Sequence, residues 1–246
     1  MPASALALAA EAAVRVVSLN LCTDELLLLL APPAQIASIT HLARDPRESV
    51  LWRQARRYPG NEGSLESIAR LQPTLVLTMG GGGKGVLARR LGLRLLDLPY
   101  PRSPAEVIGQ ARQVAAALGV PNAAEPSARR LSTLRPLALR QGAMLSAGGL
   151  SIAPDGLAAG WLRLAGYSQP ALPGNRLTLE RLATKPPKWL IRSDYRQDQQ
   201  SRAAAFLRHP LVSRLGPRTV MTDGRPWTCG GLPMLAEVAR LRAGRR

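Results

Sequence analysis

The sequence predicts an α/β protein with two Rossmann-like lobes, each a parallel sheet covered by helices, and a helical segment bridging them. Short β-branched runs alternate with helical stretches over residues 15–98 and again after residue 141. Residues 104–140 are helical in pattern and contain no strand. With 246 residues, 46% of them apolar, the chain is long enough to form a large core without disulfide support.

The first elements of the N-terminal lobe follow from β-branched runs and prolines. Arg15–Asn20 predicts a buried strand, and the leucine-rich helix after it ends at Pro32 and Pro33. Ile36–Thr40 predicts the second strand. A polar, arginine-rich stretch over residues 41–61 separates it from the next helix.

The rest of this lobe repeats the alternation. Ser64–Leu71 predicts a short helix with Ser64 as its N-cap, and Pro73–Thr78 predicts the third strand. A glycine run precedes a helix at Val86–Leu91, and Arg94–Leu98 predicts the fourth strand. Parallel strands joined in this way carry helices on both faces of the sheet.

The connecting segment is predicted from helical periodicity and prolines. Ala105–Leu118 predicts an amphipathic helix, and a second helical stretch follows over residues 122–140. Pro126 is tolerated in a first turn, whereas Pro136 is expected to end or kink the helix.

The α/β pattern resumes after this segment. The predicted elements are strands at Ala143–Ala147, Trp189–Arg192 and Thr219–Thr222, and helices at Leu157–Ala165, Thr178–Thr184 and from Pro233 onward.

An internal repeat supports two lobes. Leu65–Ala69, then a proline and an apolar strand, matches Leu179–Ala183 with an offset of 114 residues and no gap. Each copy places Ser64 or Thr178 directly before the helix. We therefore expect an N-terminal lobe over residues 15–120, a bridging helix over 121–140 and a C-terminal lobe over 141–246.

The charge of the chain is strongly positive. Lysine and arginine total 33 against 16 acidic residues, which gives +17, and all but three of the cations are arginines. Such an excess is typical of a nucleic-acid or anionic-membrane partner, or of a chain that uses arginine generally on its surface. The arginines are spread along the chain and are not interleaved with aromatics, which favours the second interpretation. No apolar run reaches the ~20 residues of a membrane helix.

Ligands of open α/β sheets bind beyond the carboxyl ends of the strands. In two facing lobes these ends would meet at a cleft, where arginines and aromatic rings suit an anionic, partly aromatic ligand. The predicted ligand-binding residues are Asn20, Cys22, His41, Arg44, Tyr100 and Arg102 from the first lobe, and Arg192, Tyr195, Arg225, Trp227 and Cys229 from the second.

The sequence contains few residues arranged as catalytic motifs. The glycine run ending in Lys84 and Gly85 lacks the spacing and the hydroxyl residue of a phosphate-binding Walker loop, and there are only two histidines. We expect no enzyme activity, no catalytic residue, no resident metal and no cofactor. The two cysteines, Cys22 and Cys229, could be free thiols, a disulfide or a pair facing the site.

Glu66 and Glu180 occupy matched positions in the repeat. An acid in the first turn of a helix is stabilised by the helix dipole, which is one sufficient explanation. The alternative, which we favour, is a pair of exposed acids, one on each lobe, that dock onto basic pockets of a partner.

Taken together, these motifs resemble the periplasmic substrate-binding proteins of ABC importers for ferric siderophores, haem and cobalamin. The motifs that carry the resemblance are Arg15–Asn20, Leu65–Ile68 with Pro73, Leu179–Leu182 with Pro187, Phe206–Leu211 and Trp227–Gly231. They extend over nearly the whole chain.

The resemblance implies two α/β lobes bridged by one long helix, with a metal chelate held between the lobes as the transported ligand. It also implies that Glu66 and Glu180 meet a permease, with the ATPase on a separate chain. A periplasmic monomer is expected, and the apolar residues 2–10 are similar to the end of an export signal, so residues 1–14 are expected to be a signal remnant or a disordered lead. Prolines within the bridge and the high positive charge depart from this pattern.

Two alternatives remain from the residues alone. A bilobal chelatase-like enzyme acting on tetrapyrroles would need a histidine and an acid aimed into the cleft, for which His41 is the candidate. A basic nucleic-acid-binding protein would use the +17 charge.

Overall fold

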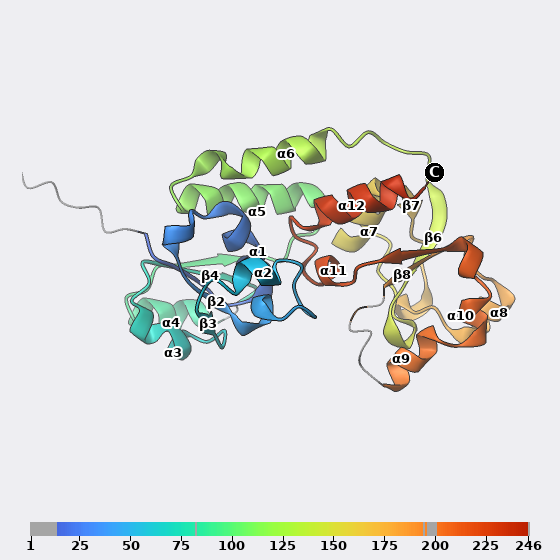
Figure 1. The fold of residues 1–246 in the computed structure, drawn as a ribbon, viewed down its shortest axis with the longest axis horizontal. Coiled ribbons are helices and arrows are strands. Elements are labelled where there is room, and N and C mark those ends of the chain that lie inside the picture. The colour runs from blue at the N-terminus through green and yellow to red at the C-terminus, as the bar shows by residue number, and fades with distance from the viewer. Residues whose placement is uncertain (1–13, 82, 194, 196–200, 246) are drawn as a thin grey trace, which may run out of the picture.

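The computed structural model describes residues 14–81, 83–193, 195 and 201–245. It contains two sheets side by side, with α5 and α6 lying along one side of the molecule (Figure 1). The predicted signal remnant falls almost wholly on residues 1–13, outside the described part of the chain. Within that part, no helix has the length and apolarity needed to cross a membrane.

The first sheet has five parallel strands in the order β3-β2-β1-β4-β5. Its strands are β1 (Val16–Ser18), β2 (Ile36–Thr40), β3 (Gly60–Asn61), β4 (Leu75–Met79) and β5 (Leu95–Leu98). Its helices are α1 (Leu21–Leu30), α2 (Trp52–Ala55), α3 (Leu65–Ile68) and α4 (Lys84–Arg90). The predicted strands were found, and the two-residue strand β3 was missed because it is too short to show a period of two.

The second sheet has four parallel strands in the order β7-β6-β8-β9. Its strands are β6 (Arg140–Leu145), β7 (Tyr167–Ser168), β8 (Trp189–Ser193) and β9 (Thr219–Thr222). Its helices are α7 (Leu157–Leu164), α8 (Leu179–Thr184), α9 (Arg202–Leu207), α10 (Pro210–Ser213), α11 (Arg225–Cys229) and α12 (Met234–Ala243).

The repeat identified in the sequence is a repeat of structure. Helices α3 and α8 begin 114 residues apart, and so do the interior strands β4 and β8. The Ser64 side chain caps α3 by accepting a hydrogen bond from the Ser67 N–H, and Thr178 caps α8 in the same way through Arg181. Equivalent capped helices therefore precede an interior strand in each sheet.

The bridging helix expected over residues 121–140 is shorter than that range, in line with the expectation that Pro136 would end or kink it. After α5 (Pro104–Ala117), a 3-10 turn at Pro121–Ala124 leads into α6 (Glu125–Ser132), and residues 133–139, here called the linker, are not helical. Pro136 has no N–H to donate, and it disfavours helical geometry at the residue before it.

Arginines near the C-terminus take over the hydrogen bonds that a helix would have made. Arg242 donates to the carbonyls of Leu164 and Arg135, at 2.7 and 2.8 Å, and Arg245 donates to the carbonyl of Ala138 at 2.8 Å. The linker is thereby fixed to the second lobe without regular secondary structure.

One apolar core crosses between the lobes. It contains Leu27 of α1 and Val114 of α5 from the first half, together with Trp161 of α7, Ile191 of β8 and Met234 of α12 from the second. All five are fully buried. An interface of this kind resists the relative motion that is normal between domains joined by a polar surface.

Candidate functional site

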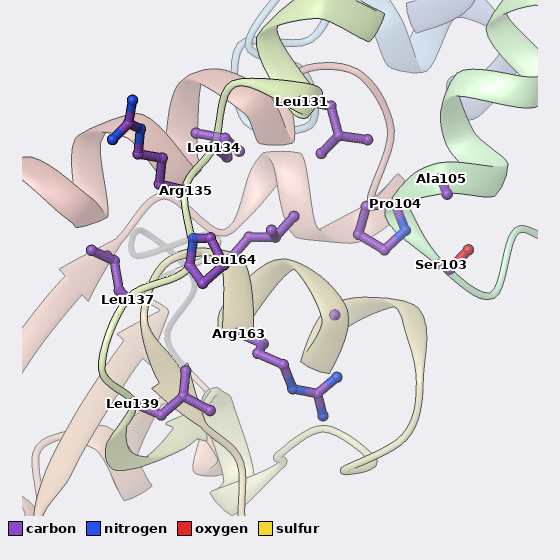
Figure 2. A pocket seen from close by; sticks show the side chains of 12 residues that line it. Ser103, Pro104, Ala105, Leu131, Leu134, Arg135, Leu137, Leu139, Arg163 and Leu164 are labelled. Atoms are coloured by element: carbon purple, nitrogen blue, oxygen red, sulfur yellow. The ribbon is translucent and has the colours of Figure 1, made fainter.

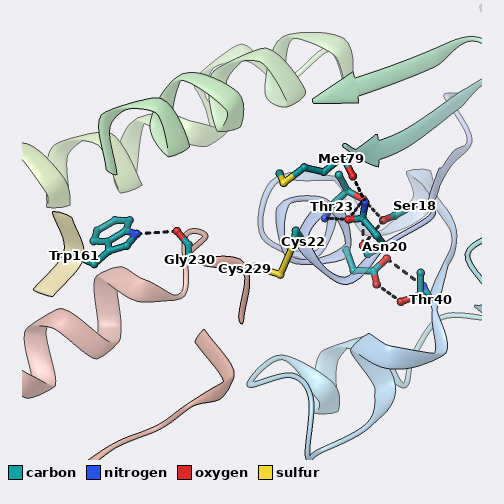
Figure 3. Close-up of a disulfide and its surroundings, with 10 residues drawn as sticks. Ser18, Asn20, Cys22, Thr23, Thr40, Met79, Trp161, Cys229 and Gly230 are labelled. Atoms are coloured by element: carbon teal, nitrogen blue, oxygen red, sulfur yellow. Dashed lines mark hydrogen bonds between the residues drawn. A yellow bond between two sulfur atoms is a disulfide. The ribbon is translucent and has the colours of Figure 1, made fainter. Parts of the chain in front are cut away.

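A disulfide joins the two lobes next to the strand ends. Cys22 lies in the first turn of α1 and Cys229 ends α11, and their sulfurs are bonded with a Cα–Cα separation of 5.2 Å (Figure 3). Of the three states that the sequence left open, the structure has the disulfide. In this state the pair offers no thiolate to a metal or a substrate.

The side chain of Asn20 is already hydrogen-bonded within the protein. Its Nδ2 donates to the Met79 carbonyl at 3.1 Å, and its Oδ1 accepts the Thr23 N–H at 3.0 Å as the N-cap of α1. The side chain therefore joins the carboxyl ends of β1 and β4 and starts the helix that carries Cys22.

The segments that follow the strands of the two sheets touch each other. Arg225, after β9, donates from Nη1 to the Pro46 carbonyl at 2.8 Å, and the Tyr195 hydroxyl, after β8, donates to the Glu48 carboxylate. Asp223 holds Arg225 in place through charge-assisted hydrogen bonds, which include Nε to Oδ1 at 3.0 Å and Nη2 to Oδ2 at 2.6 Å. Two of the predicted ligand-binding residues are thus brought to the boundary between the lobes.

Charge and burial act in opposite directions on Asp223. Partial burial acts to raise the pKa of this carboxyl, but the hydrogen bonds and charge of Arg225 hold the pKa below its ordinary value. Nearby, the indole of Trp227 donates to Thr222 Oγ1 at 2.8 Å. The loop around α11 is therefore fixed by its own polar contacts.

The remaining predicted residues lie at separate points of the strand edges. His41 follows β2, is exposed, and its Nδ1 is 3.3 Å from Glu62 Oε2. Arg44 is half-buried against Gly60, and Arg192 is half-buried within β8.

Tyr100 is the most exposed of the predicted aromatic residues, at 69%. Its ring lies over Gly80, where a Cβ would stand 2.3 Å from a ring carbon, so the close approach requires glycine there. Arg102, two residues later, is exposed, and its guanidinium makes no hydrogen bond to any residue in the described ranges. Both residues therefore lie beyond the carboxyl end of β5, with Tyr100 also next to the end of β4.

Two buried acids on α1 were not predicted as site residues. Asp24 accepts hydrogen bonds from Thr40 N at 3.1 Å and Thr40 Oγ1 at 2.5 Å. Burial raises the pKa of Asp24 to about 6, although hydrogen bonds from Ser18 and Thr40 act to lower it. The sequence signal was available, because two adjacent acids begin a run of five leucines.

Glu25 has fewer hydrogen-bond partners among the described residues than Asp24 has. Burial raises the pKa of Glu25 to about 8, and the charge of Asp24 adds to this rise. Its Oε2 has no hydrogen-bond partner among the described residues, and a Cβ at Gly231 would stand 2.8 Å from this atom. An acid of the first lobe is therefore pressed against the loop that follows Cys229 in the second.

The comparisons with known proteins bear on the fold. No protein-family model and no curated protein matches the chain. The periplasmic haem-binding protein BhuT, solved with two haems, is 20% identical and superposes with a TM-score of 0.72, covering 93% of this chain and 96% of BhuT.

Two further solved structures give the same result. RhuT from Roseiflexus sp. RS-1, a periplasmic haem-binding protein in apo form, is 19% identical, with a TM-score of 0.72 over 94% of this chain and 97% of RhuT. HutB of Vibrio cholerae, also a periplasmic haem-binding protein, is 18% identical, with a TM-score of 0.68 over 94% of this chain and 98% of HutB. The chain therefore has the bilobal α/β fold of periplasmic binding proteins.

The disulfide is expected to stabilise the arrangement of the lobes. Replacing both Cys22 and Cys229 with serine removes a crosslink between residues 207 positions apart. We expect the free energy of unfolding, measured in urea, to fall by about 2–5 kcal/mol. Reductant should destabilise the native chain by a similar amount and leave the double variant unchanged. Equal stability of the two proteins without reductant would contradict this role.

The buried acids predict that stability falls as pH rises. The folded chain binds the protons of these acids more tightly than the unfolded chain does. For Glu25 the resulting stabilisation is fully present below the ordinary pKa of 4.5, and it is lost as the pH rises to about 8. At pH 7 the loss for Glu25 amounts to about 3 kcal/mol. Glu25→Gln should flatten the decline in unfolding free energy between pH 5 and 8.5.

The matched control for this measurement is Glu66→Gln, at an exposed glutamate of the same lobe. Urea unfolding of the control should follow the native pH profile. A native slope in Glu25→Gln would show that Glu25 is not the group responsible.

Proposed function

We propose that this chain is a periplasmic receptor that captures a metal chelate between its lobes and delivers it to an ABC importer. The observation that carries the proposal is the meeting of the two sets of strand ends, through Arg225 with Pro46 and Tyr195 with Glu48. Ligands of parallel α/β sheets bind at this edge. The shared fold of BhuT, RhuT and HutB supports the same conclusion.

Haem is the first candidate for the chelate. The three similar proteins are described as haem-binding, and the strand edges of this chain carry groups that suit a planar macrocycle with carboxylate substituents. The exposed ring of Tyr100 can stack on such a ligand, and the guanidinium of Arg102 can pair with a carboxylate. Ferric siderophores and cobalamin are the other candidate ligands.

Of the remaining predicted ligand-binding residues, His41 follows β2 and Trp227 follows β9. His41 and Trp227 are the candidates to flank the ligand, while Arg225 and Tyr195 connect the lobes on one side of it. We do not assign a ligand-binding role to Asn20 or to the disulfide, because their polar atoms and sulfurs are already engaged within the protein.

The proposed receptor works with little motion between its lobes. The disulfide and the common apolar core both oppose opening, so the ligand is expected to enter a largely preformed site. A preformed site loses less conformational entropy on binding. Release to the permease then depends on local rearrangement of the loops at the strand ends.

Glu66 and Glu180 are the proposed contacts with the permease. Both are exposed, and each is the second residue of a capped helix, α3 in one lobe and α8 in the other. The structural repeat gives them equivalent positions in the two lobes. Two arginine-lined pockets of a permease could therefore receive them together, and the ATPase of the importer would be a separate chain.

Titration of tryptophan fluorescence tests the ligand. We expect saturable quenching by haem at micromolar or tighter affinity, and weaker or no quenching by ferric citrate, hydroxamate and catecholate siderophores or cobalamin. Replacing Arg102 with Ala should weaken binding about 10-fold, whereas Arg94→Ala, at an exposed arginine before β5, should not. Absence of saturation with all of these chelates would contradict the proposal.

Uptake measurements test the docking residues. We expect the double substitution of Glu66 and Glu180 with Ala to abolish permease-dependent uptake while leaving ligand affinity unchanged, because both acids are exposed and neither is among the predicted ligand-binding residues. Substituting the neighbouring exposed residues Ser67 and Arg176 with Ala is the control. Loss of ligand affinity in the double variant would move these acids into the binding site and overturn the docking role.

A further inference from the structure

A cavity of about 500 Å³ lies where the two lobes are connected (Figure 2). Its walls are the first turn of α5 at Ser103–Ala105, the end of α6 with the linker, and α7 at Gly160–Leu164. The linker runs directly into the start of β6, so this cavity is at the amino end of that strand. The proposed ligand site is at the carboxyl ends, and the two are therefore distinct.

The lining of this cavity, here called the linker cavity, is apolar. Five leucines dominate its wall: Leu131, Leu134, Leu137, Leu139 and Leu164. Leu139 is 48% exposed, so apolar surface is left open to water. Small-molecule sites have volumes in the range of about 300–1,000 Å³ and consist mainly of apolar walls with a few polar groups.

The polar groups here are two cations. Arg135, on the linker, and Arg163, on α7, line the cavity on either side of Leu164 (Figure 2). Both are exposed, and neither guanidinium has a hydrogen bond or an ion pair with another described residue. The neighbouring Arg242 and Arg245 differ, because their guanidiniums are bonded to backbone carbonyls.

Charge and shape together identify the class of ligand. An uncharged apolar molecule would use the leucines and leave both guanidiniums unused, and a small anion would use a guanidinium and leave the leucines uncovered. An amphiphile with one apolar chain and one anionic head group satisfies both sets. Arginine binds carboxylate and phosphate head groups alike through paired N–H donors.

We propose that the linker cavity binds a single-chain anionic amphiphile, with its chain against the leucines and its head group paired with Arg163 or Arg135. The walls come from the helix that follows the first sheet, from the linker and from α7 of the second lobe. A bound chain would therefore contact both halves of the molecule and brace their connection. This inference does not rest on the proposed transport function.

Calorimetric titration of the full chain tests the proposal, with decanoate below its micellar concentration as the probe. We expect saturable binding of one decanoate per chain and binding of decanol at least 10-fold weaker. Decyl phosphate distinguishes a phosphate head group from a carboxylate, and either head group binding better than decanol supports the proposal. Equal affinity for decanoate and decanol, or heats that never saturate, would overturn it.

Variants locate the site. Replacing Arg135 and Arg163 together with Ala should reduce decanoate affinity to that of decanol, whereas Arg89→Ala, at an exposed arginine of α4, should have no effect. Leu139→Ser, at a half-exposed position of the cavity wall, should weaken the binding of both probes. Unchanged decanoate binding in the double arginine variant would overturn the assignment, and so would displacement of decanoate by a chelate bound at the strand ends.

Discussion

The fixed relation between the two sheets is the constraint on which the rest of the structure depends. A buried apolar cluster extends from α1 and α5 into α7, α12 and β8, and the disulfide from Cys22 to Cys229 closes the same junction covalently. Trp161, fully buried in this cluster, donates its indole N–H to the Gly230 carbonyl at 2.8 Å, which ties the core to the residue after Cys229 (Figure 3). Apolar packing, a hydrogen bond and a covalent bond thus set one orientation of the lobes, and the strand ends are brought together as a result.

The same junction also buries two acidic side chains, which lowers the stability of the folded chain at neutral pH. Asp24 and Glu25 are adjacent, buried and close to the disulfide, and Glu25 lacks a hydrogen-bond partner for one oxygen among the described residues. Burial raises the pKa of both acids, and at neutral pH Glu25 therefore holds a proton that the unfolded chain would release. An apolar residue at position 25 would avoid that loss of stability, so the composition of α1 is not explained by packing alone.

Sequence reasoning predicted the elements that have a clear period or cap and missed those that depend on tertiary contacts. The repeat with its Ser64 and Thr178 caps was visible because capping and strand burial are local properties. The bridging helix is shorter than the range that the resemblance implied, because Pro136 interrupts this stretch and the linker carbonyls of Arg135 and Ala138 instead accept hydrogen bonds from arginines 107 positions later. The candidate residues were predicted because each follows the carboxyl end of a strand. Pairings such as Tyr195 with Glu48 could not be predicted, because they depend on the relative orientation of the two lobes, which no local sequence pattern encodes.

The structure gives a physical explanation for part of the arginine content. Among the described residues, the guanidiniums of Arg15, Arg56, Arg140, Arg176, Arg225, Arg240, Arg242 and Arg245 donate to backbone carbonyls. Several of these carbonyls lie in segments without regular secondary structure, such as Pro46, Arg135 and Ala138. The planar guanidinium of arginine has five N–H donors in fixed directions, so it can donate to such carbonyls while its charge stays in water. The ammonium of lysine has three donors, and their directions are not fixed. The +17 charge therefore follows in part from how this chain completes its backbone hydrogen bonds, and it does not by itself indicate a nucleic-acid partner.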